Sequence, residues 1–271
     1  MLIKLGLKSQ KGLTLIEMMV GIVVGMLVVA AATAFYITSI RSSADTMRMT
    51  KLTNEARTIM SLMVSDLRRA GYWSESAPGE PGEPIEENPF AVRDVGTANH
   101  TDLSIYNNGE CILYSYDATY RPGPAGNPKT PGVVHTVDIM GYALDGTDLR
   151  IHNGTLTDTS ACDTNNWQRA NDPSTVAITS LQFFTDGSRC RNASTGDSWE
   201  IPVDSDETIP ACECTDVAIC PGYVAPTTGD LLVELRQIRI LMEAEHLSDP
   251  DTSVTLEDQV KIRNNRLFYA P

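Results

Sequence analysis

The sequence lacks the residue patterns of the common catalytic and metal-binding sites. Its four histidines do not form a His-Glu-x-x-His arrangement, and there is neither a Gly-x-Ser-x-Gly elbow nor a glycine-rich phosphate loop. The hydroxyl and thiol of Ser188-Arg-Cys190 have no identifiable base partner. We therefore expect a protein that is not an enzyme and that holds no cofactor and no metal ion.

Positive charge is also scarce. The 271 residues include 21 Lys and Arg but 35 Asp and Glu, which gives a formal net charge of −14. Such a surface repels phosphate groups, which argues against nucleic acid as a partner. The acidic excess lies in residues 74–271, because residues 1–73 carry nine basic and four acidic side chains. A basic N-terminal segment therefore precedes a strongly acidic domain.

No charged residue occurs between Met18 and Ile40, a run of 23 residues. At about 1.5 Å per residue, a helix of this length crosses a hydrocarbon core of roughly 30 Å. Lys4, Lys8 and Lys11 precede the run without any acid. The positive-inside rule then predicts a single-pass membrane helix with the lysines in the cytoplasm and the acidic domain outside it.

The helical pattern continues beyond the apolar run. Apolar residues recur at helical spacing from Leu52 to Ala70, and Gly71 is the first credible stop. The sequence predicts one helix from residue 13 to about residue 71, with an apolar first half and an amphipathic second half.

Glu17 stands near the start of the apolar run, where an unpaired carboxylate costs about 2.5–3.5 kcal/mol. It ends the stretch Lys11-Gly-Leu-Thr-Leu-Ile-Glu17, which resembles the prepilin signature of type IV pilins and pseudopilins. The resemblance implies cleavage between Gly12 and Leu13 by a prepilin peptidase, followed by N-methylation of Leu13. The family usually has Phe in place of Leu13.

Cleavage at this point leaves the apolar segment attached as an anchor and creates a new α-amine at Leu13. Glu17, four residues further on, then lies near a helix N-terminus at low dielectric, where it can pair with an amine of an adjoining subunit. We expect Glu17 to set the register of subunit assembly, a role that the resemblance also implies. Gly21 and Gly25 form a Gly-x-x-x-Gly face, which supports close helix packing.

The end of the predicted helix carries a second resemblance. Asp66-Leu-Arg-Arg-Ala-Gly-Tyr72 is similar to a segment of the PilW family of minor pilins, and pseudopilins of the GspJ type share part of it. The resemblance implies an α+β, type IV pilin-like fold, in which the long N-terminal helix packs on an antiparallel β-sheet head. It also implies a minor pilin that initiates or caps a type IV pilus and supports adhesion and twitching motility.

The family implies a location at the bacterial inner membrane, with a periplasmic head, and then in the extracellular pilus. The implied partners are other minor pilins, the major pilin, the prepilin peptidase, the assembly platform and a large tip adhesin. Two alternatives stay open. One is a GspJ-like pseudopilin of a type II secretion system, and the other is a pilus-borne ligand- or DNA-binding module with a local basic patch around Arg236 and Arg239.

The composition divides the chain into five expected parts. These are a leader (1–12), a transmembrane or filament-core half-helix (13–40), an amphipathic half-helix (41–73), a loop rich in Pro, Gly and acid (74–90), and a β-rich head (91–271). The expected strands are Asp102–Tyr106, Cys111–Tyr116, Val133–Leu144, Asp148–His152, Thr175–Thr185, Leu231–Glu243 and Val254–Arg263.

All six cysteines lie in the expected head, at Cys111, Cys162, Cys190, Cys212, Cys214 and Cys220. An even count in an exported domain predicts disulfides, although six cysteines allow fifteen pairings. Zinc is disfavoured because no histidine lies between residues 210 and 229 and no Cys-x₂-Cys spacing occurs. The acidic clusters Asp204–Glu207 and Asp249–Asp251 lack the twelve-residue calcium loop, so we expect a solvated surface there.

Overall fold

The computed structural model describes residues 12–73, 88–94, 100–118, 129, 133–152, 154 and 156–271. Residues 1–11 of the expected leader and residues 74–87 of the expected Pro/Gly/acidic loop lie outside these described residues. The chain divides into two compact units, Met1–Arg48 and Met49–Pro271, and each is described by itself.

One helix, α1 (Leu15–Leu67), runs unbroken for 53 residues. The α-helical pattern stops four residues before the expected end at Gly71. Arg69 N–H donates to the Asp66 carbonyl and Ala70 N–H to that of Leu67, so the last turn tightens to i→i−3 bonds. Gly71 then takes the left-handed conformation, with φ of +69°, that commonly ends helices.

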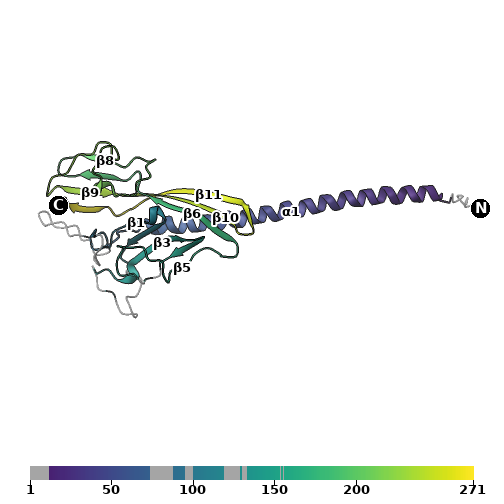
Figure 1. Cartoon of the computed structure of the whole chain (residues 1–271), viewed down its shortest axis with the longest axis horizontal. Helices are drawn as coiled ribbons and strands as arrows, with labels where there is room; N and C mark the ends of the chain where they lie inside the picture. The colour runs from purple at the N-terminus through teal and green to yellow at the C-terminus, as the bar shows by residue number, and fades with distance from the viewer. Residues whose placement is uncertain are drawn as a thin grey trace, which may run out of the picture. The chain divides into compact units, whose positions relative to one another are not determined.

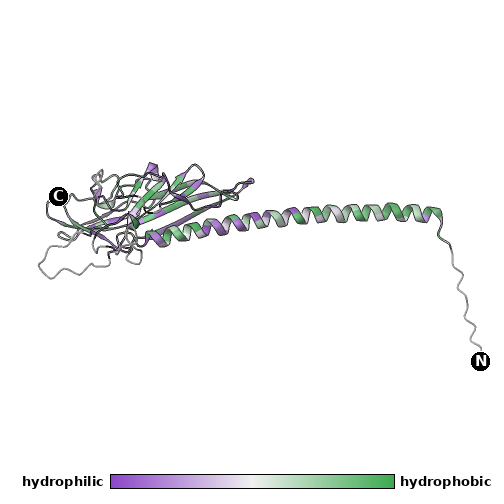
Figure 2. Ribbon diagram, turned by 90° about the horizontal axis from the view of Figure 1, so that it is seen from below, coloured by the Kyte–Doolittle hydropathy of each residue, from purple (hydrophilic) through white to green (hydrophobic). Residues whose placement is uncertain are grey.

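The two halves of α1 differ in exposure. Every residue from Gly12 to Ser43 is exposed, and Figure 2 shows this part of the helix to be mostly apolar. In the second unit, the predicted stripe is buried, with Leu52, Ala56, Met63 and Leu67 at 0% exposure. These residues recur at helical spacing on one face of α1, and that face therefore forms one wall of the head core.

The described residues of the head form three antiparallel sheets (Figure 1). The first has the order β1-β2-β3-β4-β5 and is built from β1 (Ser104–Tyr106), β2 (Cys111–Ser115), β3 (Ile139–Asp145), β4 (Asp148–Ile151) and β5 (Gln168–Arg169). Its residues alternate between two faces. Ile112 and Tyr114 belong to the core that includes α1, whereas Cys111 and Leu113 pack with Trp167 on the other face.

The second sheet joins β11 (Asp249–Lys261), β10 (Gln237–His246) and β6 (Val176–Phe184) in that order. The third joins β12 (Arg266–Tyr269), β9 (Leu231–Leu235), β7 (Arg189–Asn192) and β8 (Ser198–Glu200). Three 3₁₀ turns complete the described elements: η1 (Asn107–Gly109), η3 (Thr136–Asp138) and η4 (Ala211–Glu213). The expected α+β fold, with one long apolar helix and antiparallel sheets, is confirmed.

Several predicted strand boundaries are wrong. The single strand expected over Leu231–Glu243 is two strands, β9 and β10, in two different sheets. They separate at Arg236, whose side chain is buried and pairs with Asp102. The strand expected from Val133 begins only at Ile139, because η3 occupies the residues before it. Strands β5, β7, β8 and β12, which are two to four residues long, were not expected.

Two main clusters of buried residues hold the head together. The larger one joins the α1 stripe to the first two sheets, with Tyr114, Phe183 and Ile240 among its members. The smaller one underlies the third sheet, where Trp199 packs with Leu232 and with four cysteines. The third sheet therefore has its own core.

Candidate functional site

The residues around the expected cleavage point are exposed. Gly12, Leu13 and Thr14 precede α1, and Leu13 is 77% exposed. A Cβ atom added to Gly12 would meet no atom within 4 Å, so the fold of this chain does not require glycine there. If glycine is required at this position, the requirement would therefore come from another protein that recognises it, such as a peptidase.

Thr14 and Glu17 form a reciprocal pair at the start of α1. The Thr14 N–H and hydroxyl donate to Glu17 Oε2 over 3.0 and 2.9 Å, while the Glu17 N–H donates to Thr14 Oγ1 over 3.3 Å. This is a capping box, and it satisfies backbone donors that the first turn leaves unpaired. The spacing Thr14-x-x-Glu17 is the sequence signature of this capping box.

Gly21 and Gly25 lie on the exposed part of α1. A Cβ atom at either position would meet nothing within 4 Å, so both glycines leave an open face for another helix. By length and composition, α1 is long and apolar enough to cross a membrane, with a mean hydropathy of 2.5 over its most apolar window and no buried residue there. Large apolar side chains in water at this density indicate a surface that something else covers.

The motif at the end of α1 fastens the helix to the head. Tyr142, from β3, donates a hydrogen bond of 2.7 Å to Asp66, which is only 7% exposed. Arg69 pairs with the other Asp66 oxygen and lies 4.8 Å from the centre of the Tyr116 ring. Asp66 and Arg69 therefore connect the last helical turn to two neighbouring segments of the first sheet.

Gly71 makes the closest approach of this segment to the head. Its N–H donates to the Ser115 carbonyl over 2.8 Å. A Cβ atom at Gly71 would lie 2.9 Å from Arg236 Nη2, which itself donates to the Asn264 carbonyl. Only glycine suits this position, because φ is positive and the guanidinium fills the space that a side chain needs.

All six cysteines are paired. The disulfides are Cys111–Cys162, Cys190–Cys212 and Cys214–Cys220, and the chain has no free cysteine. The first joins β2 to the segment before β5, and the other two lie in the core of the third sheet. Among the described residues, no group of three or more His, Cys, Asp and Glu side chains is placed to hold a metal ion.

A buried ionic cluster lies where β9 passes into β10. Asp102, fully buried, forms ion pairs with Arg93 and Arg236. Glu234, also fully buried, lies 3.8 Å from a guanidinium nitrogen of Arg93 and 3.8 Å from one of Arg266. Burial alone would raise the pKa of Asp102, but the guanidiniums of Arg236 and Arg93 outweigh it and hold this pKa at about 2. The cluster has no sequence signature, since its members come from four separate places in the chain, at residues 93, 102, 234–236 and 266.

The basic patch around Arg236 and Arg239, on which the alternative of DNA binding depends, does not form. Arg236 is 4% exposed and is neutralised by Asp102. Arg239 donates to Asp186 over 2.8 Å and covers the Phe184 ring at 4.1 Å. Both guanidiniums therefore form ion pairs within the head. The hypothesis that they make a basic patch for DNA binding is wrong. The acidic residues Asp204 and Asp251 are exposed.

In a comparison with known protein families, the chain matches two family models. Residues 45–262 match the family model described as prepilin peptidase-dependent protein B. Residues 7–33 match the prokaryotic N-terminal methylation motif. No curated protein matches the chain. No solved structure matches it either.

Proposed function

The chain belongs to the family of prepilin peptidase-dependent protein B, and we propose that this type IV pilin-like protein is a minor pilin of the PilW type. In this proposal it takes part in starting pilus assembly at the inner membrane and is incorporated at or near the pilus tip. It acts by assembly, without catalysis. The proposal rests on the similarity of Asp66–Tyr72 to the PilW segment and on the methylation motif.

The observation that carries the proposal is the exposure of the apolar half of α1. From Gly12 to Ser43 no side chain is buried by the chain itself, although the segment is apolar enough to span a bilayer. Two environments would cover such a surface in turn. The bilayer covers it while the subunit is stored, and neighbouring helices cover it in a filament, where the glycine face of Gly21 and Gly25 allows close approach.

The N-terminal residues have distinct roles in this proposal. A prepilin peptidase cuts between Gly12 and Leu13, and the new amine of Leu13 is methylated. Residues 13–40 form the anchor and filament-core half of the helix, 41–73 the amphipathic half, 74–90 the connecting loop and 91–271 the periplasmic head. Glu17 pairs with the amine of an adjoining subunit and so fixes the axial register of the helices.

The proposed partners are the prepilin peptidase, the assembly platform, the major pilin, other minor pilins and a large tip adhesin. The proposed location is the inner membrane first and the extracellular pilus later, with consequences for adhesion and twitching motility. Loss of protein secretion in place of loss of pili, on deletion of the gene, would instead support the type II secretion role of a GspJ-like pseudopilin.

The capping box makes a sharp test of Glu17 possible. Glu17→Gln keeps an oxygen that can accept from Thr14, and glutamine also serves in capping boxes, but it removes the charge. Thr14→Val is the matched control, because it removes the cap hydroxyl and keeps the carboxylate. We expect Glu17→Gln to reach the membrane at normal levels and to be excluded from sheared pili, while Thr14→Val is incorporated.

Processing is tested separately. Gly12→Leu should leave the leader on the protein, which the apparent mass of the membrane-bound chain reports. Normal processing of Gly12→Leu, or normal incorporation of Glu17→Gln into pili, would contradict the proposed roles.

A further inference from the structure

Lys129 places a buried amine between two carboxylates. It lies in the connection between β2 and β3, and its side chain is 9% exposed. Its Nζ lies 3.2 Å from Oδ1 of Asp117 and also pairs with Oδ1 of Asp138. The side chains of these two acids are 4% and 0% exposed. The other lysines in the described part of the chain, Lys51 and Lys261, are exposed.

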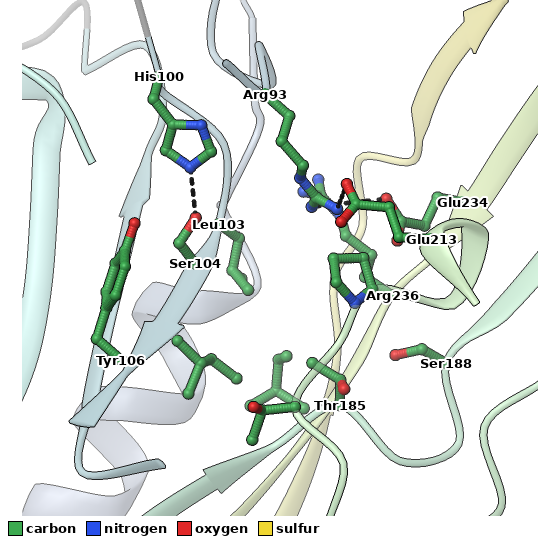
Figure 3. A pocket seen from close by; sticks show the side chains of 14 residues that line it. Arg93, His100, Leu103, Ser104, Tyr106, Thr185, Ser188, Glu213, Glu234 and Arg236 are labelled. Carbon is green, nitrogen blue, oxygen red and sulfur yellow. Dashed lines mark hydrogen bonds and ion pairs between the residues drawn. The ribbon is translucent and has the colours of Figure 1, made fainter. Parts of the chain in front are cut away.

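The ionic cluster around Asp102 uses arginine as its cation. Figure 3 shows Arg93 and Arg236 of that cluster, with Arg93 against the carboxylate of Glu213. A guanidinium stays protonated in proteins, so it can form ion pairs but does not act as a nucleophile. An amine in a buried site can give up its proton and then act as a nucleophile. Lys129 can therefore react in a way that the arginines cannot.

The carboxyl group of Asp138 is held in a fixed orientation. Asp138 ends η3, and its main-chain carbonyl accepts from the Tyr116 N–H over 3.1 Å. Its Oδ1 accepts from the Ala118 N–H and its Oδ2 from the His135 N–H, each over 3.0 Å. Backbone donors in these positions also stabilise the negative charge that develops on the oxygens when a nucleophile adds to the carboxyl carbon.

Asp117 is the second acid beside the amine. Its own N–H donates to the Tyr72 carbonyl over 2.7 Å, which fixes its backbone next to the end of β2. A carboxylate within hydrogen-bond distance of an amine can carry protons to and from it. The amine of Lys129 therefore contacts one acid that can react with it and another that can transfer its protons.

Contact and burial both favour condensation of this amine with a carboxyl group. Groups held in the right geometry react as if they were present at about 10⁵–10⁸ M, which exceeds the concentration of the water that would hydrolyse the product. An amide also replaces two buried charges with one neutral group, and so removes their desolvation cost.

We propose that Lys129 and Asp138 form an isopeptide bond within the head. Nζ of Lys129 bonds to Cγ of Asp138, and one C–O bond of that carboxyl group breaks. Two of the three ammonium protons pass through the carboxylate of Asp117 to the departing oxygen, which leaves as water. Nothing is oxidised or reduced, and no other reactant is needed. This inference does not depend on the proposed role in pilus assembly.

Mass spectrometry of the full chain, purified in detergent micelles, tests the bond. After reduction and alkylation of the cysteines, trypsin cuts an unlinked chain after Lys129 and releases the peptides 94–129 and 130–150. Trypsin does not cut after a lysine whose amine is in an amide bond. We therefore expect a single peptide, 94–150, that is lighter than its sequence by one water molecule.

Fragmentation of this peptide locates the bond. A bond between Lys129 and Asp138 closes a ring, so cleavage of the main chain between these two residues should release no fragment ions. Recovery of mainly the two separate peptides at their full masses would overturn the proposal. A bond from Lys129 to Asp117 instead would overturn the roles given to the two acids.

Two variants test the reacting groups. Lys129→Arg keeps a positive charge between the acids but removes the amine, so we expect trypsin to release both peptides at full mass. Asp117→Asn keeps Lys129 and Asp138 but removes the proton carrier, so we expect the linked peptide to be lost. Near-UV circular dichroism reports whether both heads are folded. A loss of water that persists in Lys129→Arg would overturn the assignment, and the result for the wild-type chain stands whether or not the variants fold.

Discussion

The Tyr142 hydroxyl donates a 2.7 Å hydrogen bond to the carboxylate of Asp66, across 76 residues of sequence. Asp66 lies in the last turn of α1, where the helix dipole disfavours negative charge. The hydrogen bond from Tyr142 and the ion pair with Arg69 offset this unfavourable interaction. The same contacts join the helix end to the first sheet. The acid of the Asp-Leu-Arg motif therefore serves as a fastening point between helix and head.

Removal of the Tyr142 hydroxyl tests this fastening. Tyr142→Phe leaves the carboxylate of Asp66 buried with one donor fewer, so we expect the free energy of unfolding of the head to fall by about 1–3 kcal/mol. Urea titration of the full chain, followed by near-UV circular dichroism, measures it. Tyr72→Phe, at a tyrosine that is 44% exposed, should change the midpoint little. A Tyr142→Phe midpoint equal to that of the wild type would contradict the interpretation.

Gly71 and Gly146 form a matched pair for a second prediction. Both have positive φ, +69° and +64°, but a Cβ atom at Gly71 meets Arg236 while one at Gly146 meets nothing within 4 Å. Gly146→Ala should cost only the left-handed strain of about 1–2 kcal/mol. Gly71→Ala should cost about 1 kcal/mol more, because it also displaces Arg236 from Asn264. Equal losses in thermal unfolding would show that the guanidinium moves aside freely.

The low pKa of Asp102 predicts an acid-sensitive head. The folded value of about 2 lies below the ordinary value of 3.8, so this group stabilises the fold fully above about pH 4. That contribution is lost as the pH falls from about 4 to 2. The free energy of unfolding, measured by urea titration at pH 7, 4 and 3, should therefore fall as the pH falls.

Asp102→Asn should remove this part of the pH dependence. At pH 7 it leaves Arg93 and Arg236 without their shared carboxylate, and we expect a loss of about 3–5 kcal/mol. Asp204→Asn, at an exposed position, serves as the control. Wild-type stability of Asp102→Asn at pH 7 would exclude a central role of this carboxylate in the cluster.

The disulfides should contribute unequally. The Cys111–Cys162 bond closes a loop of 51 residues, whereas Cys214–Cys220 closes one of 6. In the chain-entropy account, replacing the first pair with serines should cost about 2 kcal/mol more than replacing the second. Urea midpoints of the two double variants measure the difference, and a larger loss from the short loop would contradict that account.

The sequence predicted the features that depend on local pattern. The helical spacing of Leu52, Ala56 and Met63 identified the buried face of α1, and the strand-favouring composition of Cys111–Tyr116 identified a strand of the first sheet. The helix end needed a correction of four residues, because its last turn tightens where the chain bonds to the head.

The sequence did not predict the features that depend on distant partners. Arg236 lies in an alternating run and was considered as part of a basic patch, but its side chain is buried against Asp102, 134 residues away. The break between β9 and β10 lies at this residue, and no local pattern predicted it. The short strands β7 and β8 likewise exist through pairing and a disulfide more than through their own propensity.

The continuity of α1 has a mechanical consequence. The helix that offers its apolar half to a bilayer or a fibre also supplies Leu52, Met63 and Leu67 to the centre of the head core. The part of the helix from Leu52 to Leu67 is therefore held by the innermost contacts of the head, and pulling this part out would expose Leu52, Met63 and Leu67 to water.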